Sequence, residues 1–206
     1  QSLRPASVKS NMPLLTVLAE WRFYRGHGTV YRDLAHRWAK GTAILFAVGA
    51  ISGTVLSFEM GLLWPSFMRI YGDVIGLPFA LEGIAFFTEA IFLGLYLYGW
   101  DRLPPRAHRR LLIPISVAGA VVTFCIIAVN AWMNDPTGFR VENGEITDIK
   151  PFEALFNSNM WHEMVHMYLA GIIVAGFLVA SVYAVGWLRG NRERRHRVGL
   201  VVALTF

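Results

Sequence analysis

Residues 74–99 read VIGLPFALEGIAFFTEAIFLGLYLYG, a stretch in which Glu82 and Glu89 are the only charged residues. The stretch is longer than the ~20 residues that an α-helix needs to cross the hydrocarbon core of a bilayer. A carboxylate at that depth costs several kcal/mol unless it is protonated, paired or in contact with water. The sequence therefore predicts a membrane-spanning helix that keeps two glutamates in spite of this cost.

The spacing of Glu82 and Glu89 places both side chains on nearly the same face of that helix. Seven residues correspond to about 700° of helical rotation and roughly 10 Å along the axis. Ionisable residues inside a membrane typically mark proton relays, ion paths or cofactor sites. A structural interpretation, in which a buried polar pair helps the helices to pack, stays open beside the functional one.

Apolar segments recur along the whole chain, which has 206 residues and is 55% hydrophobic. They predict four complete membrane spans, at about residues 41–63, 74–99, 111–133 and 164–188. Shorter apolar runs at residues 12–19 and 198–206 predict partial spans at both ends, so we expect this chain to be one piece of a longer protein. The expected fold is all-α: a polytopic transmembrane helical bundle that forms a single membrane domain over residues 1–206.

The loops between these spans alternate in charge. Residues 21–40, 101–110 and 189–197 are rich in arginine and lysine, whereas residues 64–73 and 134–163 are not. Cytoplasmic loops of membrane proteins carry the excess of basic residues, so we expect the three basic loops to be cytoplasmic and the other two to be external. Because topology accounts for the net charge of +5, the basic residues do not indicate nucleic-acid binding.

The external loop at residues 134–163 contains one local structural signal. Asn143 and Gly144 lie between two short alternating runs, which is the pattern of a β-hairpin with a type I′ turn. We expect this hairpin to be a cap on the external side, and we see no residues for chemistry in it.

Two of the six histidines, His162 and His166, are four residues apart and share one face at the start of the fourth span. Their segment matches the His-Glu-x-x-His formula of zinc peptidases, although no third ligand is apparent. A histidine that faces a helical bundle is also a standard axial ligand of haem iron. On the residues alone, haem ligation, metal binding and a hydrogen-bonded interfacial histidine are equal alternatives.

The remaining sequence patterns favour no other chemistry. The other four histidines lie in basic loops and are expected to be solvated: His27, His36, His108 and His196. The glycines follow no predicted strand, and no Ser-His-Asp or Cys-His arrangement is suggested. A phosphate-binding or hydrolytic enzyme is therefore disfavoured.

Four segments, in this order along the chain, resemble subunit I of the cytochrome bd-type quinol oxidases. They are residues 37–64 (RWAKGTAILFAVGAISGTVLSFEMGLLW), 78–102 (PFALEGIAFFTEAIFLGLYLYGWDR), 130–136 (NAWMNDP) and 166–171 (HMYLAG). The sequence pattern that contains Glu82, Glu89 and the Gly-Trp-Asp-Arg at residues 99–102 is highly specific to this family. The similarity extends from about Met12 to the end of the chain, which is less than half of a typical family member.

The resemblance implies a haem-binding subunit of a terminal oxidase of the aerobic respiratory chain. Such oxidases take electrons from a membrane quinol and reduce O2 to water with proton uptake, using haem b in low-spin and high-spin forms and haem d. They work with a second oxidase subunit in the bacterial plasma (inner) membrane. By position, His166 is expected to be an axial ligand of the low-spin haem iron. Glu89 is expected on the proton path to the high-spin haems, and Glu82 in the wall of the haem d pocket.

The chain departs from the family at both ends. The family has a haem-ligating histidine at the start of its first span, but residues 1–11 contain no histidine. The methionine that completes the low-spin haem, a haem-ligating glutamate and the quinol-binding loop belong to spans beyond Phe206. We therefore expect that this length of chain does not complete a three-haem site. Two alternatives stay open: an inactive fragment of the subunit, or a haem-free proton- or ion-translocating protein that uses Glu82 and Glu89.

Overall fold

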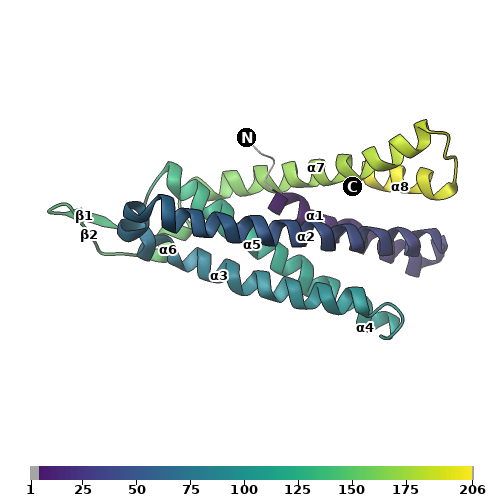
Figure 1. The fold of residues 1–206 in the computed structure, drawn as a ribbon, viewed down its shortest axis with the longest axis horizontal. Helices are drawn as coiled ribbons and strands as arrows, with labels where there is room; N and C mark the ends of the chain where they lie inside the picture. The colour runs from purple at the N-terminus through teal and green to yellow at the C-terminus, as the bar shows by residue number, and fades with distance from the viewer. Residues whose placement is uncertain (1–4, 206) are drawn as a thin grey trace.

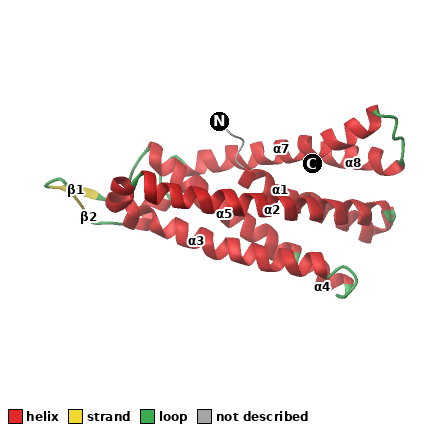
Figure 2. Ribbon diagram, in the orientation of Figure 1, coloured by secondary structure: helices red, strands yellow, loops and turns green. Residues whose placement is uncertain are grey.

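The computed structural model describes the backbone of residues 5–205 and the side chains of residues 11–56 and 58–205. Most of this part is helical, which confirms the predicted all-α fold (Figure 2). The helices are α1 (Pro5–Arg22), the π-helix η1 (Phe23–His27), α2 (Val30–Leu63), α3 (Pro65–Tyr98), α4 (Pro105–Arg110), α5 (Leu112–Asn134), α6 (Pro151–Leu155), α7 (Met160–Leu188) and α8 (Arg194–Leu204). The strands are β1 (Arg140–Glu142) and β2 (Glu145–Thr147).

The long helices run along one axis of the molecule (Figure 1). The strands β1 and β2 and the short helix α6 lie at one end, which we call the hairpin end. At the other end lie α4 and the turns that join α1 to α2 and α7 to α8. We call it the basic end, because it holds the arginine-rich residues 21–40, 101–110 and 189–197.

Four helices in the described part of the chain are long and apolar enough to cross a membrane. They are Val30–Leu63, Pro65–Tyr98, Pro105–Asn134 and Met160–Leu188, of which the third joins α4 and α5. The prediction of a polytopic bundle with four spans is thereby confirmed. The chain is a membrane protein.

All four spans begin earlier than hydropathy predicts, and the difference is largest for α2 and α3. α2 begins at Val30 rather than at residue 41, and α3 begins at Pro65 rather than at residue 74. The predicted loop at residues 64–73 is therefore wrong, because the chain leaves the helical conformation only at Trp64, with φ −123° and ψ 51°. Pro65 restarts the helix at its first position, where a missing N–H needs no intrahelical partner.

Helix α1 lies among the other helices, although the sequence predicts only a partial span at residues 12–19. It extends over Pro5–Arg22 and packs against α2, α5 and α7. Its polar side chains Asn11, Thr16 and Glu20 are buried together with its apolar ones. Hydropathy underestimates the length of this helix because it treats inward-facing polar residues as if they were solvated.

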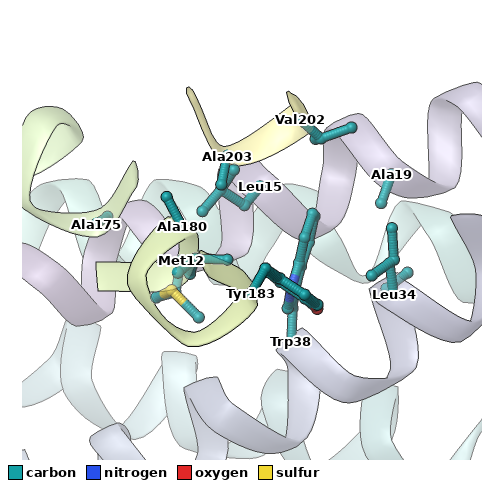
Figure 3. Packing of buried hydrophobic residues seen from close by; sticks show 12 residues of the cluster. Met12, Leu15, Ala19, Leu34, Trp38, Ala175, Ala180, Tyr183, Val202 and Ala203 are labelled. Carbon is teal, nitrogen blue, oxygen red and sulfur yellow. The ribbon is translucent and has the colours of Figure 1, made fainter. Parts of the chain in front are cut away.

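A buried apolar cluster joins α1, α2, α7 and α8 (Figure 3). At its centre, Nε1 of Trp38 donates a hydrogen bond to the hydroxyl of Tyr183, with 2.9 Å between nitrogen and oxygen. Gly199 of α8 lies against the same tyrosine ring, and a Cβ at this position would be 2.7 Å from the ring atoms. Tyr183 of α7 therefore contacts α2 on one side and α8 on the other.

The predicted β-hairpin is confirmed. β1 pairs with β2 in antiparallel register, with Glu142 opposite Glu145. Asn143 and Gly144 have positive φ angles of 54° and 84°, as a type I′ turn requires.

The contact between Gly199 and Tyr183 generates a stability prediction. Gly199→Ala should lower the free energy of unfolding by about 1–3 kcal/mol, because the new methyl group must displace a ring that is held by Trp38. Gly76→Ala on α3 is the matched control: its Cβ would meet no atom within 4 Å, so better helix propensity should leave stability unchanged or higher by about 1 kcal/mol. Thermal unfolding in detergent, followed by circular dichroism, measures both. An equally stable Gly199→Ala protein would contradict this packing.

Candidate functional site

Glu89 lies on the face of α3 that is buried in the bundle. Its side chain is 0% exposed, and Ala85 and Leu93, one turn before and after it, are buried on the same face. α3 packs mainly against α5. The structure thus places a carboxylate inside a membrane-spanning helix and away from the outer surface of the bundle.

Glu82 lies two turns before Glu89 on the same helix and is half-buried. It is close enough to the buried thiol of Cys125 on α5 for an electrostatic interaction. The seven-residue spacing continues beyond Glu89 to Tyr96, which is also buried. Polar groups therefore recur every two turns along α3, and the third of them, Tyr96, is not among the site residues predicted from the sequence.

His166 is placed differently from the two glutamates. It lies on α7, near the hairpin end, and its side chain is exposed. The apolar side chains of Val165, Leu169 and Ile173 are exposed along the same side of the helix. α5 packs against both α3 and α7, so it connects the helix of the glutamates with the helix of the histidine.

The side chains around His166 are better suited to a single bond from histidine to haem iron than to a zinc site with several ligands. In the part of the chain that the structure describes, no group of three or more His, Cys, Asp or Glu side chains could hold a metal ion. An open imidazole on an apolar helix face is, by contrast, suited to a haem, which needs one histidine on one side of its iron and apolar surface around its ring. The residues present therefore fit the prosthetic group that the resemblance implies.

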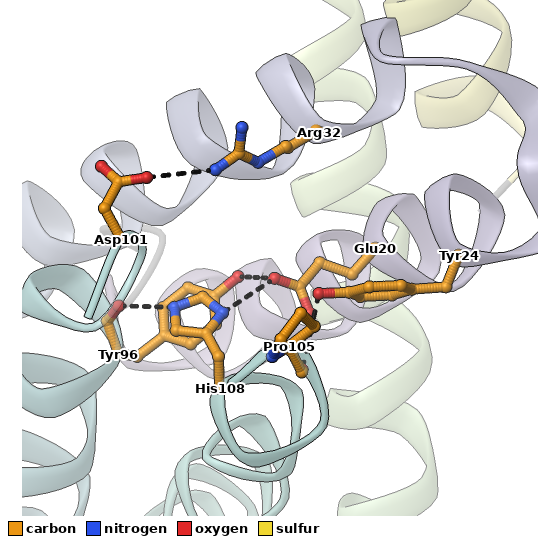
Figure 4. A network of polar contacts seen from close by, with 7 residues as sticks. All are labelled: Glu20, Tyr24, Arg32, Tyr96, Asp101, Pro105 and His108. Carbon is orange, nitrogen blue, oxygen red and sulfur yellow. Dashed lines mark hydrogen bonds and ion pairs between the residues drawn. The ribbon is translucent and has the colours of Figure 1, made fainter. Parts of the chain in front are cut away.

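A polar cluster that the sequence patterns do not predict lies at the basic end (Figure 4). It consists of Glu20 of α1, Tyr96 of α3 and His108 of α4, which are 2%, 1% and 3% exposed. The expectation that His108 is solvated is wrong. His27 is exposed as expected, whereas His36 and His196 are half-buried in helices α2 and α8. The one available signal was Glu20 itself, an acid that directly follows the apolar run at residues 12–19.

One carboxylate oxygen holds this cluster together. The hydroxyl of Tyr96 donates a hydrogen bond to Oε1 of Glu20 at 2.8 Å, and Nδ1 of His108 lies 3.3 Å from the same oxygen. Nε2 of His108 lies 2.8 Å from the backbone carbonyl of Tyr96, and the two rings stack with centroids 4.3 Å apart. The cluster therefore fastens α1 to the ends of α3 and α4.

A pocket opens beside the cluster. It has a volume of about 470 Å³ and is lined by Tyr24, Pro104, Pro105, Arg106 and Arg109. Partial burial and the nearby carboxylate of Glu20 raise the pKa of Tyr24, while Arg109 and Arg32 act in the opposite direction. The Tyr24 phenol is thus neutral at physiological pH.

Comparison with known proteins identifies the family. Residues 6–206 match the model of the family described as cytochrome bd terminal oxidase subunit I. The chain belongs to this family. The match covers the polar residues of α3, the cluster at the basic end and His166.

Three curated relatives are similar over most of the chain. A "putative cytochrome bd menaquinol oxidase subunit I" from Bacillus subtilis is 35% identical over 97% of this chain and 46% of its own length. A "cytochrome bd ubiquinol oxidase subunit 1" from the same organism is 34% identical over 92% of the chain and 42% of its length. A "cytochrome bd-II ubiquinol oxidase subunit 1" from Escherichia coli is 32% identical over 81% of the chain and 33% of its length. The chain thus spans less than half the length of these relatives.

A solved structure has the same fold. The bd oxidase from Geobacillus thermodenitrificans aligns with a TM-score of 0.92 and 40% sequence identity, over 97% of this chain and 46% of that chain. At this similarity, the arrangement of the helices in this bd oxidase subunit I segment is that of the solved oxidase.

The different placement of Glu89 and His166 can be tested by thiol labelling. In this chain, purified in detergent with Cys125 replaced by alanine, the cysteine of a His166→Cys variant should react rapidly with maleimide, because position 166 is exposed. The cysteine of a Glu89→Cys variant should react only after unfolding, because position 89 is 0% exposed. Mass spectrometry measures both rates. Equal rates at the two positions would contradict the orientation of α3 and α7.

Proposed function

We propose that this chain is part of the haem-binding subunit of a terminal quinol:oxygen oxidoreductase of the aerobic respiratory chain. The complete enzyme oxidises a membrane quinol and reduces O2 to water, together with a second oxidase subunit. The relatives named as menaquinol and ubiquinol oxidase subunits support this assignment. The observation that carries it is Glu89, a fully enclosed acid in the segment of α3 on which the resemblance to the family rests.

His166 is the proposed axial ligand of a low-spin haem b. Its imidazole is exposed on an apolar face of α7, and one ring nitrogen of a neutral histidine is free to coordinate iron. The bound haem supplies one-electron redox chemistry. The high-spin haem b and haem d of the complete oxidase need further ligands from the rest of the subunit.

Glu89 and Glu82 are the proposed proton carriers, and they contribute to the pocket of the high-spin haems. Each can bind a proton at a carboxylate oxygen and release it again. A proton that arrives in an apolar interior compensates the charge of an arriving electron, which would otherwise be costly to bury. The two side chains lie on nearly one face of α3, about 10 Å apart along the helix axis, so they mark a line through the membrane.

The charge pattern sets the proposed orientation in the bacterial plasma (inner) membrane. Loops rich in arginine and lysine remain in the cytoplasm, so the basic end faces the cytoplasm and the hairpin end faces outward. His166 then lies toward the external side. Electrons enter near the hairpin end, and protons reach Glu89 from the basic end.

The haem assignment predicts a spectral loss. In the complete oxidase that contains this segment, His166→Ala should abolish the sharp alpha band of low-spin haem b in dithionite-reduced minus oxidised spectra, because no other residue replaces the imidazole. His162→Ala, four residues earlier on the same helix, should keep the band. An unchanged spectrum in assembled His166→Ala oxidase would refute the ligand and favour the haem-free proton or ion carrier.

The proton assignment predicts a kinetic loss. Glu89→Gln keeps the shape of the side chain but cannot exchange a proton, so quinol oxidase turnover should fall roughly 100-fold, while the KM for quinol stays unchanged. Glu89→Asp, which keeps a carboxylate, should retain more activity than Glu89→Gln. Steady-state oxygen consumption at a series of quinol concentrations measures both values. Full turnover of Glu89→Gln would exclude this residue from the proton path.

A further inference from the structure

The Glu20–His108 pair has no role in the function proposed so far, yet it is the most enclosed acid–base contact that the structure describes at the basic end. Burying such a pair is costly, and it is often no more stabilising than an apolar contact of similar volume. A structural role alone is therefore a weak explanation for it. Its position directly beyond Glu89 along α3 suggests a role in proton movement.

The hydrogen bonds determine where this pair can exchange a proton. Nε2 of His108 faces the backbone carbonyl of Tyr96, and a carbonyl only accepts, so Nε2 carries a hydrogen. Nδ1 faces Oε1 of Glu20, so one proton is shared between the ring and the carboxylate. A second proton can bind at Oε2 of Glu20, which is buried and has no hydrogen-bond partner among the described residues. The pair can thus bind and release a proton without losing its contacts.

Tyr24 separates the pair from the pocket at the basic end. Its ring lines the pocket, and its hydroxyl donates a hydrogen bond to the backbone carbonyl of Pro105 at 3.4 Å. Figure 4 shows this hydroxyl beside the carboxylate of Glu20. The phenol of Tyr24 therefore lies between the pocket and the acid.

On the inner side, a small cavity lies beside Tyr96. It has a volume of about 10 Å³ and is lined by Tyr96 and Leu93 of α3 and by Thr16 and Thr42, among others. This volume is at the lower limit for one water molecule. Leu93 lies one turn from Glu89, so the cavity covers part of the distance between the cluster and the buried acid. The two threonine hydroxyls donate to the backbone of their own helices and can still accept a hydrogen bond.

We propose that Glu20 and His108 form the site where protons from the basic end enter this segment on their way to Glu89. A proton from pocket water passes Tyr24, binds the Glu20–His108 pair, and leaves through the cavity at Tyr96. Only O–H and N–H bonds form and break, and each proton that leaves toward Glu89 is replaced by one from the pocket. The inference rests on the proposed function, because it takes Glu89 as the acceptor.

Two arginines near the pair act against the binding of an additional proton. Arg32 of α2 acts electrostatically on His108, whereas Arg109 of α4 acts on Tyr24 of η1. Asp101 holds Arg32 at 3.3 Å on the outer side (Figure 4). Arg32 thus opposes an additional positive charge at His108, and Arg109 opposes one at Tyr24.

The same contacts would hold three helices together even if no proton moved. A test therefore needs a substitution that keeps the hydrogen bonds and removes the proton site. Glu20→Gln comes closest to this, because its amide oxygen still accepts the hydrogen bond from the Tyr96 hydroxyl, whereas the neutral amide cannot bind and release a proton. Tyr183→Phe is the matched control, since it removes one buried hydrogen bond, from Trp38, and leaves the acid and the imidazole of the cluster in place.

The test uses the complete oxidase that contains this segment, with its partner subunit. Proton uptake is followed with a pH-indicator dye after the reduced enzyme is mixed with O2, and haem content and the KM for quinol are measured on the same samples. Glu20→Gln should slow proton uptake by ~10-fold or more, with haem content and KM unchanged. Tyr183→Phe should stay within about twofold of the unmodified enzyme, because it leaves the proton site intact.

Wild-type proton uptake in fully haem-loaded Glu20→Gln oxidase would overturn the proposal. If that variant does not assemble, His108→Gln takes its place: slow uptake supports the proposal and normal uptake overturns it. Glu89→Gln, measured in parallel, separates this inference from the proposed function. If proton uptake is slow in Glu89→Gln but normal in Glu20→Gln, only the proposed entry site at Glu20 and His108 is refuted. Normal uptake in both also refutes the role of Glu89.

Discussion

This structure depends on one physical constraint: a carboxylate that is buried inside an apolar helical bundle needs a proton or a polar partner. Glu20 and Glu89 are both almost completely enclosed. Glu20 meets the constraint through Tyr96 and His108, and these contacts draw α1, α3 and α4 together at the basic end. Glu89 lies two turns from Tyr96 on the same helix, so α3 links the two buried acids.

The packing around α1 makes this arrangement possible. α1 contacts α2, α5 and α7, and the Trp38–Tyr183 hydrogen bond fastens α2 to α7 beside it. Because α1 is packed among these helices, Glu20 lies inside the bundle rather than on its surface. The resulting division of the molecule suits the proposed oxidase: the imidazole for haem lies near the hairpin end, and the polar groups for protons lie along α3 and at the basic end.

The sequence predicts the spans and the hairpin well, because long apolar runs and the Asn143-Gly144 turn are local signals. It places Glu82 and Glu89 correctly on α3, since seven residues are close to two full turns. It does not predict the partners of Glu20, because Tyr96 lies 76 residues away and is brought to it only by helix packing. Hydropathy also cannot distinguish an inward-facing polar residue from a solvated one. The helix predicted for α1 is therefore too short, and His108 is wrongly predicted to be solvated. The roles of His166 and the glutamates come from the family resemblance, and the structure adds their surroundings.

Redox-induced infrared difference spectroscopy of the complete oxidase tests the central claim most directly, namely that enclosed acids in this segment bind and release protons with the redox state of the haems. The account predicts a difference band in the carbonyl-stretch region of protonated carboxylic acids that shifts in D2O. The Glu89 contribution should vanish in Glu89→Gln, and a second contribution should vanish in Glu20→Gln. Difference spectra that are identical in the unmodified enzyme and both variants would contradict the account, because neither acid would then change protonation during turnover.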